Sequence, residues 1–535
     1  MNFAPSKNLK AMRGKFYLLA LATMMLSCSK ETDVQNYGIN YSYGRDLRHD
    51  KIVLGQRLEN PYKTENVTKA LASLYPTKAD RVEVKATDLY VRFLPADKEE
   101  CDLLVDMGLE LIDHPLDYDI KVEGDWYHDP EVPDERVTWQ YAVVPVGFEF
   151  PDHIEYELID ECYIINSTTV KSDGIDWEAV EREAYRLTGN IERYEQDFTK
   201  ASSKAVPSGR ITIVDPDANG GKPFGVAGVK VSCNSFVKFD SAYTDRDGYY
   251  KMNKSYSSKP RYRLIFQNSK KFAIGLDLIL VPASVSTLGK SSPSGVNMTV
   301  TSSSDSKLFR RCVVNNAVYD YYTRCSEEDL GLATPPSDLR IWIFHSLQAS
   351  SAVMLHHDAV LSNSMLASYL GTWAVLLKYF LPDITLGLSG HSDYASIYAE
   401  TCHELAHASH FTKVGTKYWN NYIAYIIGSY IKNNGMLYGD GTGEHAGKCE
   451  VGEMWAYYIQ SRMFKDRYGG PFPSYGTSSW FYPQIFRGLD ERGMKPSQFM
   501  SALTSDVVDR ASLKQKLIEG NPTKRTIIEQ VFSRY

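Results

Sequence analysis

The sequence is poor in cysteine and contains no paired cysteine motif. Its 535 residues include eight cysteines, and no two of them form a C-x-x-C pair. After Cys28 seven scattered cysteines remain, so a disulfide framework is not indicated. Cys312 and Cys325 could form a pair, but their spacing alone does not establish one.

Long basic runs and long internal apolar runs are also missing. The net charge is −7, so nucleic-acid binding has no electrostatic support. Beyond the first 28 residues, no stretch is long and apolar enough to cross a membrane. With 43% hydrophobic and 23% charged residues, the composition is typical of a soluble protein. A chain of this length is too long to fold around a single hydrophobic core, so about two to four domains are expected.

The N-terminal residues have the pattern of a signal peptide. A basic segment precedes the apolar stretch Phe16 to Leu26, and we predict a signal peptide over residues 1–28. The ending Met25-Leu26-Ser27-Cys28 resembles a bacterial lipobox, in which Cys28 carries the lipid. The following charged residues, 29–33, resemble the signal that directs some Gram-negative lipoproteins to the cell surface. We therefore expect a secreted protein anchored to the outer membrane through Cys28; a plain secretory signal is the alternative.

The next segments predict a tether and a small α/β domain. Residues 29–85 are polar and weakly patterned, as in a tether or entry segment. Residues 86–204 combine strand-like alternation at 89–94 with helical spacing at 98–107 and a charged connecting helix at 176–198. This domain could be a plug over a cleft in a later domain or a structural spacer, and the spacer is the simpler interpretation.

Residues 205–270 contain short strands separated by turns, which predicts a small β-sandwich. The segments Gly228-Val229-Lys230-Val231 and Thr244 to Tyr250 resemble the carboxypeptidase regulatory-like family of transthyretin-like sandwiches. Asp245 and Asp247 suggest a calcium loop, but the full EF-hand pattern is absent. A turn stabilised by local hydrogen bonds of the aspartates is the preferred interpretation.

The C-terminal part of the chain changes to long helical runs. Residues 271–304 are rich in Ser, Thr, Gly and Val and predict strands and loops that connect two domains. Residues 305–535 form the largest predicted domain, with helical runs at 351–379, 394–412 and 450–464.

The sequence His403-Glu404-Leu405-Ala406-His407 carries the predicted chemistry. His403 and His407 are four residues apart, so a helix places both imidazoles on one face, where they can bind one metal ion. The surrounding run contains no Gly or Pro and favours a helix. Glu404 then lies near the open coordination position, where it can accept a proton from a zinc-bound water. Zn²⁺ is therefore the expected cofactor, and Glu404 is the expected catalytic base.

A catalytic zinc needs a third protein ligand. The His-x-x-Gly-x-x-His pattern of metzincins is absent, and Gly452-Glu453-Met454-Trp455-Ala456 instead resembles the gluzincin segment that supplies a ligand Glu. This resemblance implies Glu453 as the third ligand, with Glu450 one turn earlier as its rival. The separation of 46 positions from His407 is long for this family, and Tyr457 replaces the Asp often found four residues after the ligand.

Several neighbouring residues have less definite expected roles. His410 is expected to have a structural or supporting role rather than to bind metal, and His391 could line the cleft. The segment Leu381 to Leu388 predicts either the edge strand that zincins place beside the active site or an ordinary buried strand. Residues 439–443 are glycine-rich but predict a flexible loop rather than a phosphate site. The candidates for stabilising an oxyanion are Tyr438, Tyr457, Tyr475 and Tyr482.

Together these patterns predict a multidomain α+β protein. It would comprise a small N-terminal α/β domain, a middle β-sandwich and a mainly helical zincin-like domain with an edge strand beside the His-Glu-x-x-His helix. The resemblance to gluzincins implies a zinc peptidase that acts on peptides or proteins and has no nucleic-acid partner. The alternative is a surface lipoprotein that binds polymers or peptides on a degenerate zincin scaffold.

Overall fold

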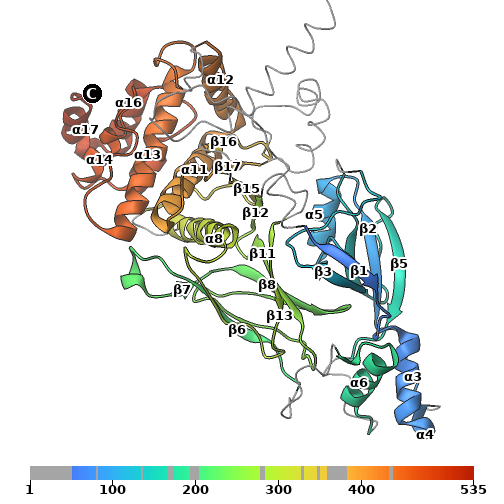
Figure 1. Cartoon of the computed structure of the whole chain (residues 1–535). Coiled ribbons are helices and arrows are strands. Elements are labelled where there is room, and N and C mark those ends of the chain that lie inside the picture. Colours follow the sequence, from blue (N-terminus) through green and yellow to red (C-terminus); the bar gives the residue numbers. More distant parts are fainter. Residues whose placement is uncertain are drawn as a thin grey trace, which may run out of the picture.

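The computed structural model describes a mixed α+β protein with several sheets (Figure 1). It describes residues 51–79, 82–133, 136–165, 174–192, 204–276, 283–326, 330–345, 350–357, 382–432 and 438–535. The expected signal peptide over residues 1–28, including Cys28, lies outside these residues. No helix within the described ranges is both long enough and apolar enough to span a membrane.

The N-terminal unit is built on two small sheets. β1 (Val53–Arg57) pairs antiparallel with β3 (Tyr118–Val122). β2 (Asp88–Leu94) lies between β4 (Gln140–Pro145) and β5 (Glu155–Cys162), antiparallel to both. The helices of this unit are α3 (Thr64–Leu74), α4 (Pro76–Ala79), α5 (Lys98–Asp106) and α6 (Trp177–Leu187).

Residues 51–79, predicted as part of a tether, instead belong to this folded unit. Their apolar side chains Val67, Ala70 and Leu71 lie on one face of α3 and are buried in a cluster with residues of α6. The polar face of α3 and the short exposed strand β1 explain why the segment resembled a tether in the sequence.

Two sheets then share one hydrophobic core, as in a sandwich. The first contains β6 (Ser208–Ile213), β7 (Phe224–Gly225), β10 (Tyr249–Lys251) and β14 (Met298–Val300). The second contains β8 (Val229–Ser235), β9 (Lys238–Tyr243), β11 (Arg261–Asn268) and β13 (Val285–Lys290). The short 3₁₀ helix η1 (Asn219–Gly221) precedes β7. Asp245 forms a local turn, because its side chain accepts hydrogen bonds from the amides of Asp247 and Tyr249, both at 2.9 Å.

The second sheet continues into the C-terminal half of the protein. β12 (Phe272–Leu276) pairs with β11 and runs parallel to β15 (Leu339–Phe344), which runs parallel to β17 (Ile384–Gly387). The predicted connection at 271–304 therefore supplies β12 to this sheet and β13 and β14 to the sandwich.

The strand before the metal-site helix is internal rather than at the edge. β16 (Ser351–Ala352) pairs antiparallel with β17 at Thr385 and Ile384, and it is the terminal strand in the sheet order. The prediction that β17 lies at the edge of the sheet is therefore wrong, and β17 is an ordinary buried strand. The predicted helical run at 351–379 begins instead with β16, and residues 358–381 lie outside the described part.

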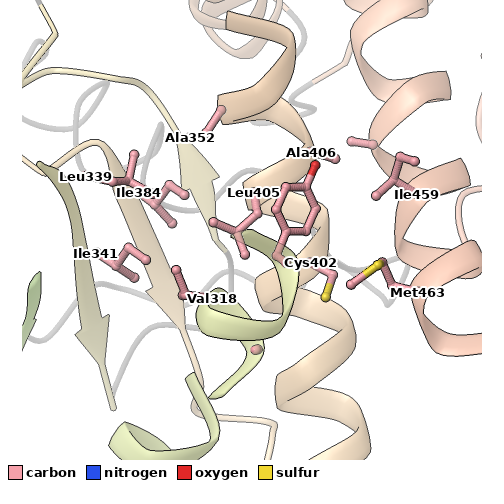
Figure 2. Close-up of a cluster of buried hydrophobic side chains, with 14 of the residues drawn as sticks. Val318, Leu339, Ile341, Ala352, Ile384, Cys402, Leu405, Ala406, Ile459 and Met463 are labelled. Atoms are coloured by element: carbon pink, nitrogen blue, oxygen red, sulfur yellow. The ribbon is translucent and has the colours of Figure 1, made fainter. Parts of the chain in front are cut away.

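Helices cover this sheet and form the C-terminal layer. They are α8 (Ser306–Cys325), α11 (Tyr394–Val414), α12 (Thr416–Lys432), α13 (Ala446–Tyr468), α14 (Gln484–Asp490), α15 (Pro496–Ala502), α16 (Arg510–Gly520), η2 (Pro522–Lys524) and α17 (Arg525–Phe532). Figure 2 shows α11 between the strands and α13, with Leu405 near Ile384 and Ala406 facing Ile459. The side chain of Asp393 caps the start of α11 by accepting from the amide of Ser396, and Gly415 follows its last turn with φ 77°.

The seven cysteines among the described residues are buried, and none of them forms a disulfide. Cys312 and Cys325 both lie on α8, where thirteen residues separate them by about 20 Å along the axis. A disulfide between them is therefore excluded by geometry.

The N-terminal unit docks on the sandwich and on the start of the C-terminal layer. Glu181 forms a fully buried ion pair with Lys238 at 3.0 Å. Asp125 pairs with Arg311 of α8 at 3.1 Å, and Asp102 pairs with Arg340 of β15 at 2.9 Å. These contacts hold the unit against the sandwich, α8 and β15.

Arg467, in the last turn of α13, joins the helical layer to the sandwich. It donates hydrogen bonds of 3.0 and 2.9 Å to Asp215, a fully buried residue that follows β6. Four aromatic rings lie 4.7–5.6 Å from the guanidinium: Phe224, Tyr394, Tyr398 and Tyr468. Because Asp215 is fully buried, its carboxylate depends on Arg467 for charge compensation, whereas the side chain of Arg467 is 20% exposed.

We predict that Arg467→Met lowers the free energy of unfolding by about 3–5 kcal/mol, because it leaves the buried carboxylate of Asp215 without a counter-charge. Urea denaturation followed by circular dichroism measures this loss. The control is Arg525→Met, which breaks an exposed i,i+4 pair with Glu529 and should cost no more than about 0.5 kcal/mol. Equal losses in the two variants would contradict the role assigned to Arg467.

Candidate metal centre

The predicted histidine pair lies on α11 with its ring nitrogens converging. One helical turn separates His403 from His407, and their Nε2 atoms are 3.2 Å apart. Both side chains are 1% exposed. The predicted helical context is therefore present, and the two imidazoles can share one ion.

Glu453 reaches this pair from α13. Its Oε2 lies 3.7 Å from Nε2 of His403, and its Oε1 lies 3.6 Å from Nε2 of His407. The indole of Trp455 donates to the carbonyl of Ala406 at 3.1 Å, which fixes α13 against α11 at the level of the site. Ala456 is fully buried at this contact, as expected for a small residue that lets two helices approach closely.

The donor set fits a divalent metal ion. The ligand atoms of His403, His407 and Glu453 all lie within 4.8 Å of one another. Two ligands of a tetrahedral zinc ion, each about 2.0–2.1 Å from the metal, lie about 3.3 Å apart. The measured separations are close to this value, so the three side chains need only small movements to hold an ion.

Glu450, the rival ligand, points elsewhere. Its Oε1 lies 3.3 Å from the guanidinium of Arg510 on α16. Although Glu450 is only one turn before Glu453 on α13, it does not belong to the group of converging ligands. The structure therefore brings together the three residues that the sequence favoured.

Burial determines the protonation of these three side chains. It lowers the pKa of His403 to about 4 and lowers the pKa of His407 well below its ordinary value. Both imidazoles are therefore neutral at pH 7, the form that binds metals. Burial also raises the pKa of Glu453 to about 8, against the opposing hydrogen bonds of two tyrosines. A cation among these groups would stabilise the carboxylate, because it replaces the solvation lost on burial.

Gln460 orients His403 from the opposite side of the ring. Its Oε1 lies 3.2 Å from Nδ1 of His403, which leaves Nε2 directed at the metal position. Tyr457, at the position where gluzincins often carry an Asp, packs its ring against His403 with centroids 4.4 Å apart. The polar partner of His403 is thus Gln460, one turn after Tyr457 on α13. Gln460 follows Glu453 by seven residues, a helical spacing that the sequence interpretation missed.

Two tyrosines bind the carboxylate of Glu453. The hydroxyl of Tyr422 on α12 donates to Oε1 at 2.6 Å, and the hydroxyl of Tyr438 donates to Oε2 at 3.3 Å. Tyr438 was a sequence candidate for another role, whereas Tyr422 carried no sequence signal. Both contacts depend on how separate segments pack around α13.

Glu404 lies beside the metal ligands on α11. A helix turns about 100° per residue, so Glu404 lies about 60° around the axis from His407. Glu404 and Glu453 are fully buried, and the two histidines are nearly so. The site is therefore enclosed in this conformation.

The remaining sequence candidates lie outside the ligand group. His410 packs against Tyr418 and Trp419, and burial lowers its pKa to about 3, which agrees with a structural role. The backbone carbonyl of His391 accepts from Arg310 at 3.1 Å. The ring of Tyr482 packs against that of Tyr535, and the carbonyl of Tyr475 accepts a hydrogen bond from Arg487. Inside the glycine-rich loop, the amide of Thr442 donates to the side chain of Asp440.

Comparison with known proteins adds no assignment. No protein-family model matches the chain, and no curated protein matches it. The interpretation of the site therefore rests on its own geometry and chemistry.

We predict that the purified protein binds one Zn²⁺ per chain and that Glu453→Ala abolishes this binding, because the variant removes the only carboxylate in the ligand group. Competition with a chromophoric chelator measures the affinity. The matched control is Glu450→Ala on the same helix, which should retain zinc. Loss of zinc in the Glu450 variant, with retention in the Glu453 variant, would reverse the ligand assignment.

Proposed function

We propose that the chain is a zinc-dependent peptidase with a gluzincin-like active site over residues 305–535. The observation that carries this proposal is the convergence of His403, His407 and Glu453 with Glu404 adjacent on the same helix. Structural zinc sites are closed by four protein ligands, whereas catalytic sites use three and keep a position for water. Three ligands beside a carboxylate that is not one of them match the catalytic arrangement. The sandwich would be an accessory unit of the carboxypeptidase regulatory-like type.

The residues have distinct roles in peptide hydrolysis. His403, His407 and Glu453 would hold the zinc ion, which would supply Lewis-acid chemistry for polarising the scissile carbonyl and lowering the pKa of water. Glu404 accepts the proton of the attacking water and later delivers a proton to the leaving amine. Gln460 and Tyr422 hold the ligand side chains in orientation through hydrogen bonds. Among the candidate tyrosines, Tyr457 packs against His403 and is the best candidate to stabilise the oxyanion, because the single hydroxyl proton of Tyr438 is donated to Glu453.

The enclosure of the site bears on how a substrate reaches it. Since Glu404 and Glu453 are fully buried, a polypeptide touches the metal position only after surrounding residues move. Such movement is common in enzymes that exclude water during reaction. We propose peptides or proteins as substrates, and the net charge of −7 gives no support for a nucleic-acid substrate.

We predict that Glu404→Gln lowers kcat for peptide hydrolysis by about 10²–10⁴-fold while zinc content is unchanged, because only the proton acceptor is lost. A fluorogenic peptide assay and metal analysis of the same preparation measure the two quantities. The control is Glu444→Gln, since Glu444 is 87% exposed and should leave kcat unchanged.

The outcomes separate the peptidase from the alternative function. Full hydrolysis by the Glu404 variant would exclude the proposed base. An unaltered protein without near-stoichiometric zinc would instead favour a binding lipoprotein on a degenerate zincin scaffold. The intact Glu404 argues against that alternative, because capture of a ligand has no use for a general base.

We also propose that the protein is anchored to the outer membrane by a lipid on Cys28, a residue outside the described part. Cys28→Ala should move the protein from the membrane fraction to the soluble fraction, because no other acylation site follows from the lipobox pattern. Fractionation with immunoblotting measures the distribution. A variant that remains entirely in the membrane fraction would contradict the lipid anchor.

A further inference from the structure

Tyr422 forms a short hydrogen bond to one of the three candidate metal ligands. Its hydroxyl donates to Oε1 of Glu453 at 2.6 Å, and both side chains are almost completely buried. A buried carboxylate requires hydrogen-bond partners, and a short bond from a phenol restricts its rotation. The position of the Glu453 carboxylate thus depends on α12 as well as on α13.

The ring of Tyr422 is itself held in place from three sides. It packs against Trp419 with centroids 4.7 Å apart and against His407 with centroids 5.8 Å apart. Gly452 lies next to the ring on a third side, since a Cβ at that position would be in ordinary van der Waals contact with Cε2 of Tyr422, 3.4 Å away. Trp419 in turn donates to the carbonyl of Ala352 at 3.1 Å, which connects this turn of α12 to β16. The packing therefore holds the hydroxyl group of Tyr422 in a fixed position relative to Glu453.

Tyr438 contacts the same carboxylate less firmly. Its hydroxyl lies 3.3 Å from Oε2, and its side chain is partly exposed. Its backbone carbonyl accepts from Tyr425 and Trp480, and its ring packs edge-on against Phe481 with centroids 5.2 Å apart. The two phenols thus differ in the length of their bonds to Glu453 and in burial.

We propose that Tyr422 is a positioning residue that orients the carboxylate of Glu453 for metal binding, with Tyr438 as a weaker second donor. The inference rests on the proposed zinc site but does not require that the site hydrolyse peptides. Partners of this kind fix the geometry of a ligand before the ion binds, which reduces the cost of ordering it on binding.

The test compares three tyrosine-to-phenylalanine variants of the full chain. Tyr422→Phe keeps the ring and removes the donor, and it should weaken Zn²⁺ binding by about 10–100-fold. It should also shift the visible absorption bands of the Co²⁺-loaded protein, because those bands report the ligand geometry. Tyr438→Phe should weaken zinc binding less than Tyr422→Phe does.

Tyr458→Phe is the matched control. Tyr458 is a fully buried tyrosine of α13, and its hydroxyl donates to Asp490 at 2.5 Å, away from the metal ligands. Its loss should leave the zinc affinity and the Co²⁺ spectrum unchanged, even if it lowers the thermal midpoint. A purely structural role for Tyr422 would make the two variants alike in all three measurements.

Each result decides the proposal. Wild-type affinity and an unchanged Co²⁺ spectrum in Tyr422→Phe would overturn it, as would a larger effect of Tyr438→Phe. If Tyr422→Phe does not fold, Tyr422→Met provides a second variant with a smaller, flexible side chain that carries no hydrogen-bond donor, and the same loss is expected. Failure of the unaltered protein to bind zinc would overturn the metal site and this inference together, whereas zinc binding without hydrolysis would leave the inference intact.

Discussion

The packing of α11 against α13 is the contact on which the metal group depends. No single helix can direct three ligands at one point, so Glu453 has to approach the His403–His407 face from another element. The indole of Trp455 and the small side chain of Ala456 set the distance and the height of this approach. A shift of α13 by one turn would move Glu453 by about 5.4 Å and bring Glu450 toward the histidines instead. The choice of ligand is thus a consequence of helix packing.

Enclosing this group imposes an electrostatic cost that the neighbouring residues reduce. Burial disfavours the charged forms of both histidines and of Glu453, as the shifts of their pKa values indicate. His403 gains a compensating contact from Gln460, and Glu453 gains two from the phenols of Tyr422 and Tyr438. The same low polarity strengthens attraction for a cation, since Coulomb interactions are less screened there. A site that is unfavourable for isolated charges is thereby suited to a metal ion.

The sequence predicted the part of the site that depends on local periodicity. His403 and His407 follow from a four-residue spacing in a helical run, and Glu453 follows from the aromatic and small residues after it. The partners of these ligands were harder to predict, because Tyr422 reaches Glu453 only through the packing of α12.

The error at the sheet edge has a similar origin. β16 contains two residues and shows no alternation that could reveal a strand beyond β17. In the N-terminal unit, a short helix with a polar outer face was mistaken for a tether.

The sandwich and the helical layer are structurally connected, although their sequence patterns suggest two separate domains. The chain leaves the sandwich after β11, supplies β12 to the sheet beneath α11, and returns to add β13 and β14. Arg467 forms a second connection between the helical layer and the sandwich, because it joins the C-terminal end of α13 to Asp215 beside β6. Glu453 therefore lies on a helix that is held by α11 at its middle and by the sandwich at its C-terminal end. Support at two points limits both sliding and rotation of α13, the two movements that would carry Glu453 away from the histidines. The sandwich thus contributes to the geometry of the metal site without touching it.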